Sequence, residues 1–334
     1  MSSDLQRPYL LFLGDAKDQL GAKTAQGVAD WRPDWCLGQL RLDGCNADLG
    51  LDDLTIDEAV SRGVRTMIIG VANAGGFLGP TWTTSIVAAL EAGLDIASGL
   101  HIKLADVDDI REAAAANGRQ LFDVRHPTEK FNTGTGVKRS GKRLLTVGTD
   151  CSLGKMYTSL AIEKALREAG AAVDFRATGQ TGIFIAGAGV SVDCVISDFI
   201  AGATEGLCPD AAPDHWDIVE GQGSLFHPAY AGVSLGLLHG AQPDYLVLCH
   251  EPTRTHMRNL PHLPLPALEV CLEANLRAAQ LTNPDVQFCG VAVNTSALDD
   301  AAGKAYLAAT EARMGLPCVD PLKDGVGRIV ERLL

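Results

Sequence analysis

The sequence predicts an α/β protein with two domains, a Rossmann-like parallel-sheet domain followed by a P-loop NTPase-like parallel α/β domain. The chain has 334 residues, enough for about two domains. It contains 36 glycines and only 5% aromatic residues, which favours many strand-to-helix turns over a β-sandwich. Short apolar runs also alternate with helical segments, and this alternation is typical of βαβ units.

The Rossmann-like domain is expected over residues 1–138. Its strands are short apolar runs, predicted at 9–13, 64–71, 95–98 and 120–124. Its helices are predicted at 23–31, 57–62, 83–92 and 107–116. The loops after its first two strands, at Gly14–Asp15 and at 72–80, do not form a G-x-G-x-x-G sequence after the first strand, so nicotinamide binding has little support.

The second domain is expected over residues 139–334. The stretch between 125 and 143 is polar, Gly-containing and basic, which is typical of a linker or mobile loop. Strands are predicted at 144–147, 172–177, 217–220, 245–249 and 287–294. Helices are predicted at 155–169, 192–201, 268–279 and 304–314.

Charge and cysteine usage limit the possible partners and the compartment. The net charge of −13 repels phosphate backbones at long range, so we expect no nucleic-acid partner. Nine scattered cysteines without a C-x-x-C pair favour reduced thiols and a cytoplasmic location. No apolar stretch is long enough to span a membrane, so we expect no membrane partner. Small-molecule substrates and a homo-oligomer are the ordinary expectation.

The segment Leu144–Ser159 (LLTVGTDCSLGKMYTS) carries the most specific motif. An apolar strand, a Gly-started turn, Gly-Lys and a helix together cradle an anionic phosphate, although a plain turn with a solvated lysine remains an alternative. The standard motif has one residue fewer between its glycines and a Ser or Thr for Mg²⁺ where Met stands here, so no metal is expected. The predicted cofactor-binding residues of this turn are Gly148, Thr149, Asp150, Cys151, Ser152, Gly154, Lys155 and Met156.

Cys151 lies inside this turn, where the helix dipole is expected to lower its pKa. A nucleophilic role is conceivable, but a small residue that fills the turn is the stronger expectation.

Polar residues also follow the next two predicted strands. Arg176 offers a two-pronged donor for a carboxylate or phosphate, with Thr178 and Gln180 as neutral polar contacts. Glu220 could act as a general base or hold a metal. Because ligands bind beyond the carboxyl ends of parallel strands, we expect these side chains to share a crevice with Lys155. A Gly-rich turn with an exposed arginine and a chance acid at a strand end are the alternatives.

The remaining candidates follow later strands. His250, Arg254 and Arg258 belong to a cluster whose cations suit a dicarboxylate or phosphate, and whose histidine could accept a proton near neutral pH. A solvated loop is the alternative. Asn294 ends the last predicted strand, where its amide could bind a nucleotide base.

These segments carry a family resemblance. VGTDCSLGKMYTS, RATGQTG, DIVEGQGSL and VAVNTS occur in an order that resembles the dethiobiotin-synthetase-type branch of P-loop proteins. Nearly the whole chain more closely resembles a two-domain family, formerly of unknown function, with a Rossmann-like and a P-loop domain. Its members are D-glutamate N-acetyltransferases, in which Met after Gly-Lys is usual. The resemblance implies acetyl transfer from acetyl-CoA to the amine of D-glutamate.

Within that activity, Lys155 and the turn would contact phosphate, with turn amides as oxyanion donors and Lys155 assisting catalysis. Arg176, Arg254 and Arg258 would hold the two carboxylates of glutamate, and Glu220 or His250 would be the base. Direct transfer is preferred over an acetylated cysteine. Two other functions stay open: an ATP- and Mg²⁺-dependent ligase or kinase of the dethiobiotin-synthetase kind, and a non-catalytic nucleotide- or CoA-binding protein.

Overall fold

The computed structural model describes residues 5–71 and 78–334, and they form two compact units. The first unit contains the chain up to residue 128 and the segment Gly179–Cys194. The second contains Glu129–Thr178 and Val195–Leu334. The sequence predicts one boundary, at 138/139, whereas the chain passes between the two units three times. Residues 72–77 of the expected Gly-rich loop lie outside the described residues.

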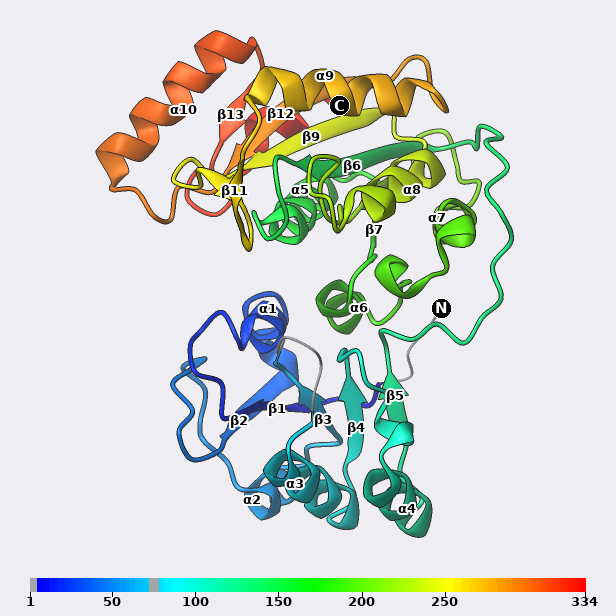
Figure 1. Ribbon diagram of the computed structural model, residues 1–334, viewed down its shortest axis with the longest axis vertical. Helices are drawn as coiled ribbons and strands as arrows, with labels where there is room; N and C mark the ends of the chain where they lie inside the picture. Colours follow the sequence, from blue (N-terminus) through cyan, green and yellow to red (C-terminus); the bar gives the residue numbers. More distant parts are fainter. Residues whose placement is uncertain (1–4, 72–77) are drawn as a thin grey trace. The chain divides into compact units, whose positions relative to one another are not determined.

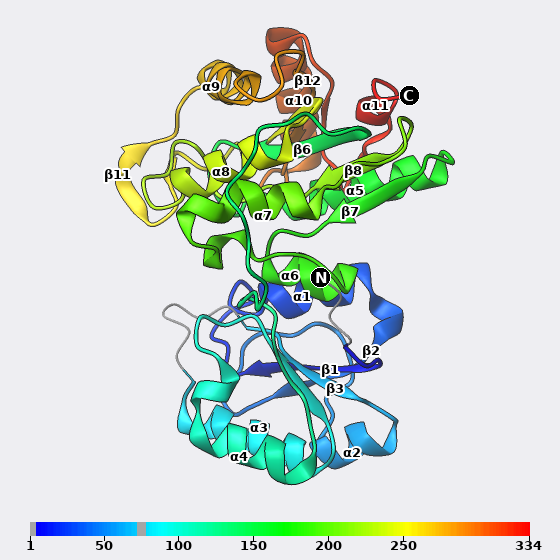
Figure 2. The ribbon, with the colours of Figure 1, turned by 90° about the vertical axis from the view of Figure 1, so that its right-hand side faces the viewer.

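The first unit is built on a five-stranded parallel sheet in the order β2-β1-β3-β4-β5, the order of flavodoxin-like folds. Its strands are β1 (Tyr9–Gly14), β2 (Cys36–Arg41), β3 (Thr66–Ile69), β4 (Asp95–Ser98) and β5 (Leu121–Asp123). Its helices are α1 (Lys23–Trp31), α2 (Ile56–Ser61), α3 (Pro80–Glu91), α4 (Asp108–Asn117) and α6 (Gln180–Ala186). Helices α2, α3 and α4 cover one face of this sheet, and α1 and α6 the other (Figure 2).

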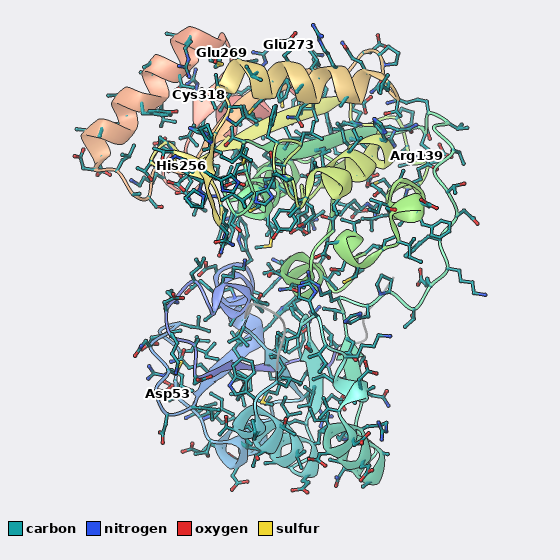
Figure 3. The ribbon with its side chains drawn as sticks, in the orientation of Figure 1. Asp53, Arg139, His256, Glu269, Glu273 and Cys318 are labelled. Carbon is teal, nitrogen blue, oxygen red and sulfur yellow. The ribbon has the colours of Figure 1, made fainter. Side chains whose placement is uncertain are left out.

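The second unit is built on a six-stranded parallel sheet in the order β13-β12-β9-β6-β8-β7 (Figure 1). Its strands are β6 (Lys142–Gly148), β7 (Val173–Arg176), β8 (Trp216–Val219), β9 (Tyr245–His250), β12 (Gln287–Val293) and β13 (Cys318–Val319). Its helices are α5 (Lys155–Glu168), α7 (Ile200–Leu207), α8 (Ala231–Ala241), α9 (Leu268–Gln280), α10 (Asp300–Met314) and α11 (Gly327–Val330). The antiparallel strands β10 (His256–Met257) and β11 (Leu260–Pro264) form a hairpin, on which Figure 3 labels His256.

Both faces of the second sheet are buried, which explains why its strands read as continuous apolar runs. Leu144 packs in a core with Ile162 of α5 and Ile329 of α11. Leu145, the next residue of β6, packs in the opposite core with Leu237 of α8 and Leu268 of α9. The central strand β6 is therefore held from both sides, and it delivers the turn that follows it to the middle of one sheet edge.

The predicted fold class is confirmed, and one predicted helix is wrong. The expected helix at 192–201 is instead two short 3₁₀ turns, Val192–Cys194 and Ser197–Phe199, followed by α7. Strand β2 and helix α8 were not predicted at all. Gly236 and Gly240 of α8 pack so closely on α7 that an added Cβ would lie 2.7 Å from Ile200 and 2.3 Å from the Ala201 carbonyl oxygen.

Candidate active site

The phosphate-type turn between β6 and α5 has backbone conformations that suit anion binding. Ser152 and Gly154 both adopt positive φ, of 54° and 98°. Gly154 is also the residue before the first helical residue Lys155, and it offers no side chain to cap the helix. The first backbone N–H groups of α5 therefore lack an intrahelical partner and are available to an anion.

Lys155 lies inside the turn. Its side chain is buried, and its Nζ donates a hydrogen bond to the carbonyl oxygen of Asp150 at 2.9 Å. A Cβ on Gly148 would lie 3.1 Å from this ammonium, and a Cβ on Gly221 would lie 2.9 Å from the lysine Cδ. Burial lowers the pKa of Lys155. The two glycines thus make room for a cation that is packed into the base of the turn.

Asp150 joins the turn to the loop after β9. One carboxylate oxygen accepts the backbone N–H of Cys151 at 2.7 Å. The other accepts Arg254 Nη1 at 3.0 Å and the backbone N–H of Arg258 at 2.7 Å. Burial raises the pKa of Asp150, but these hydrogen bonds outweigh it and the pKa is lowered overall. Asp150 is therefore a fully buried carboxylate whose two oxygens are both bound by the protein itself.

The expectation that the helix dipole would lower the pKa of Cys151 is wrong. Its pKa is raised, chiefly by burial and then by the neighbouring charge of Asp150. Lys155 and Arg258 act in the opposite direction and do not compensate. A thiol with a raised pKa is a poor nucleophile at neutral pH.

Glu220 follows β8 at the same sheet edge. Its side chain is 4% exposed, and Oε2 accepts the backbone N–H of Thr178 at 2.8 Å. The Thr178 hydroxyl donates to the Glu220 carbonyl oxygen at 2.6 Å and accepts from Gln222 Nε2 at 3.2 Å. The next position, 221, requires glycine, because a Cβ added there would lie 1.7 Å from the Thr146 carbonyl oxygen. These contacts fix the carboxylate beside the turn that holds Lys155.

His250 ends β9, the strand on the other side of β6. Its Nδ1 lies 3.1 Å from the hydroxyl of Thr149, and its ring stacks on Tyr306 with centroids 6.1 Å apart. Burial lowers the pKa of His250 to about 4, and Arg313 and Arg254 act in the same direction. The imidazole is therefore neutral across the physiological range.

Most predicted site residues meet at the carboxyl-end edge of the second sheet. Asn294 is among them, since its backbone N–H donates to the His250 carbonyl oxygen at 2.8 Å and its own side chain accepts from Ser296. The full set brought together there is Gly148, Thr149, Asp150, Cys151, Ser152, Gly154, Lys155, Met156, Thr178, Glu220, His250, Arg254, Arg258 and Asn294.

Two predicted residues are placed differently. The Arg176 side chain runs back along the sheet, with Nε donating to Asp217 at 2.6 Å and Nη2 to Asp174 at 3.2 Å. Gln180 belongs to the first unit, where it hydrogen-bonds Arg125 and lies 3.4 Å from the Thr24 hydroxyl. The RATGQTG segment thus divides between the two units, because the contacts separate them after Thr178.

The three arginines expected to bind substrate differ in what they already bind. Arg176 is paired with two aspartates, and Arg254 is bound to Asp150 and Glu251. The guanidinium of Arg258 makes no hydrogen bond or ion pair with any residue that the structure describes. Arg258 is therefore the arginine of this edge that is ready to bind a carboxylate or phosphate.

His227 is a site residue that the sequence reasoning missed. It is buried, its Nε2 donates to the Arg258 carbonyl oxygen at 3.1 Å, and its Nδ1 accepts the Ala229 N–H at 3.2 Å. Asp150, Cys151 and His227 place their potential ligand atoms within 4.8 Å of one another. Both ring nitrogens and both carboxylate oxygens already have protein partners, so this donor set fits a hydrogen-bonded structural role better than a cation site. His227 lies in the loop that follows β8, as Glu220 does, and this position after a strand was the signal available in the sequence.

These features define a class: a two-unit α/β protein whose second unit carries a P-loop turn with a buried lysine. Family models match residues 41–127 to the Rossmann-like domain, and 130–330 to the P-loop domain, of a family described as a domain of unknown function, DUF1611. The chain belongs to this DUF1611 family, and the predicted resemblance is confirmed. No helix among the described residues is long and apolar enough to cross a membrane.

Full-length relatives are also known. A protein of Pseudoalteromonas sp and one of Tritonibacter scottomollicae are each 54% identical to this chain over 98% of its length and 99% of theirs. Both are named D-glutamate N-acetyltransferase. A solved DUF1611 family protein of Anabaena variabilis is 30% identical, with a TM-score of 0.87 over 98% of both chains.

Proposed function

We propose that this protein is an N-acetyltransferase that transfers the acetyl group of acetyl-CoA to the amine of D-glutamate. The observation that carries the proposal is a phosphate-type turn around buried Lys155, flanked on neighbouring strands by the acid–base candidates Glu220 and His250. Full-length relatives at 54% identity bear the name of this activity. The amino-acid substrate and its enantiomer follow from that similarity and not from geometry.

The turn suits the phosphates of acetyl-CoA. The free backbone N–H groups at the start of α5 and the Lys155 ammonium supply charge and donors for a pyrophosphate or ribose phosphate. Met156 stands at the first-turn position where a hydroxyl would ligate Mg²⁺ in a nucleotide-hydrolysing protein. Binding a CoA phosphate requires no such ligand. The turn therefore favours an acyl carrier over ATP as the bound molecule.

The acetyl transfer needs a base for the substrate amine. The nitrogen attacks the thioester carbon, the carbon–sulfur bond breaks, and the CoA thiolate takes up one of the protons that the nitrogen loses. We assign the first proton transfer to Glu220, whose carboxylate is held beside the turn by the Thr178 N–H. His250, a neutral imidazole beside the Thr149 hydroxyl, is assigned a polar positioning role.

Carboxylate binding is assigned chiefly to Arg258. Its backbone is fixed by Asp150 and His227 on its two sides, while its guanidinium has no described partner. An arginine with a fixed backbone and unpaired guanidinium donors suits a planar carboxylate. Arg176 and Arg254 already bind protein carboxylates, and we no longer assign the substrate to them.

The experiment that tests the proposal incubates the pure protein with acetyl-CoA and either glutamate enantiomer, without metal or ATP, while free CoA thiol is measured. We expect thiol release with D-glutamate. In a parallel incubation with ATP and Mg²⁺ but without acetyl-CoA, hydrolysis of ATP would instead support the ligase or kinase alternative. Tight CoA binding without thiol release would support the non-catalytic alternative.

A further inference from the structure

The contacts of Arg254 give it a role different from substrate binding. Nη1 donates to the Cys151 carbonyl oxygen at 2.6 Å, and Nη2 donates to the Ser152 carbonyl oxygen at 3.3 Å. The same guanidinium is held by Asp150 at 3.0 Å and by Glu251 at 3.1 Å. Arg254 thus binds two successive carbonyls of the phosphate-type turn, and two carboxylates fix it there.

Binding those carbonyls orients the peptide groups that contain them. In a planar trans peptide the C=O and the following N–H point in opposite directions. When the carbonyls of Cys151 and Ser152 point at Arg254, the N–H groups of Ser152 and Leu153 must point away from it. The positive φ of Ser152, 54°, belongs to the alternating conformation that forms an anion-binding nest.

The N–H groups of this nest are without acceptors. Among the residues that the structure describes, no acceptor is found for the backbone N–H of Ser152, Leu153 or Gly154. The turn is open to solvent at Ser152, while Leu153 is buried and Lys155 occupies the base. Three adjacent unpaired donors beside a buried ammonium are therefore accessible to an anionic ligand.

We propose that Arg254 is a positioning residue that holds the 151–153 peptide groups in the orientation required to bind a phosphate of the acyl donor. It does so through the two turn carbonyls, and Asp150 and Glu251 hold it away from the substrate. The proposal rests on the proposed function for the identity of the phosphate, which belongs to CoA. Its geometric part requires only that the turn binds a phosphate.

The proposal explains why arginine stands at this position. The planar guanidinium donates to Asp150 and Cys151 from Nη1 and to Ser152 from Nη2, whereas a lysine ammonium is a point charge on a flexible stem. Arg254→Lys therefore keeps the positive charge but loses the simultaneous contacts. A residue that acted on the ligand only through its charge would tolerate this change.

The test measures CoA binding by titration calorimetry and steady-state kinetics for Arg254→Lys and Arg254→Gln. We expect the dissociation constant for CoA and the KM for acetyl-CoA to rise about tenfold or more in both variants, with the KM for D-glutamate changed less than about threefold. Acetyl-pantetheine, which has no nucleotide phosphates, should react equally well with both variants and the unaltered protein. Arg328→Gln, which removes an exposed ion pair with Glu311 of the same unit, is the matched control.

Several results would overturn the proposal. A rise in the KM for D-glutamate alone would return Arg254 to substrate binding. Unchanged CoA affinity in both variants would exclude a positioning role in the turn, and an equal loss with acetyl-pantetheine would show a general structural defect. If the unaltered protein transfers no acetyl group, the proposed function fails, while calorimetry with inorganic pyrophosphate still tests the role of Arg254 in the turn.

Discussion

The burial of neutral His250 predicts that the folded protein loses stability in acid. The folded protein holds this histidine at a pKa of about 4, chiefly because it is buried, whereas the unperturbed value is 6.5. Between these two values the unfolded chain binds a proton that the folded chain does not. The stabilisation from neutral His250 is therefore complete above pH 6.5, and it is lost as the pH falls from 6.5 towards 4.

The magnitude follows from the two pKa values. One pKa unit corresponds to about 1.4 kcal/mol, and integration from about pH 7.5 down to about pH 5 gives a loss of about 2 kcal/mol. Other groups also titrate in this range, so the effect must be isolated by comparison with a variant. His250→Asn can keep a hydrogen bond to Thr149 and cannot titrate.

The assay uses the position of the tryptophans. Of the four in the chain, Trp216 alone lies in the second unit, and it is 1% exposed. In a background where Trp31, Trp35 and Trp82 are replaced by Phe, urea unfolding followed by fluorescence reports on the unit that holds His250. We expect the stability difference between the His250 protein and His250→Asn to shrink by about 2 kcal/mol between those two pH values. A difference that stays constant would refute the burial of a neutral imidazole at this site.

Three further predictions concern the chemistry. Lys155→Ala should raise the dissociation constant for acetyl-CoA about tenfold or more, measured by calorimetry, because it removes the buried ammonium of the turn; unchanged affinity would contradict a phosphate at this turn. Glu220→Gln should lower kcat about a hundredfold or more and leave the CoA dissociation constant nearly unchanged, whereas equal activity would move the base elsewhere. Protein incubated with acetyl-CoA alone should show no acetyl adduct on Cys151 by mass spectrometry, because burial raises the pKa of its thiol; a stoichiometric adduct would argue for a covalent intermediate.

The sequence predicted the elements whose signals are local. The turn after β6 was predicted correctly as a βα junction, because a buried strand, two glycines, a lysine and a helix follow one another directly. Helix α8 was missed because Gly236 and Gly240 resemble helix breakers by propensity. In the structure they permit close approach to α7, which is a property of a neighbouring segment.

Side-chain partners from distant segments were harder to predict. Arg176 resembles a free strand-end cation until β7 and β8 are paired and Asp217, 41 residues later, is placed beside it. Gln180 follows Thr178 closely in sequence, but no local pattern indicates that α6 packs in the first unit. The double contact of Arg254 with turn carbonyls likewise depends on tertiary structure. The homo-oligomer and the cytoplasmic location stay predictions.

The central claim is acetyl transfer from acetyl-CoA to D-glutamate, and product analysis tests it most directly. The pure protein is incubated with isotope-labelled acetyl-CoA and D-glutamate, without metal or ATP, and the mixture is analysed by mass spectrometry. The account predicts labelled N-acetyl-D-glutamate in amounts equal to the CoA released, and far less product with the L-enantiomer. Intact acetyl-CoA and unmodified D-glutamate, after an incubation long enough for many turnovers, would contradict it.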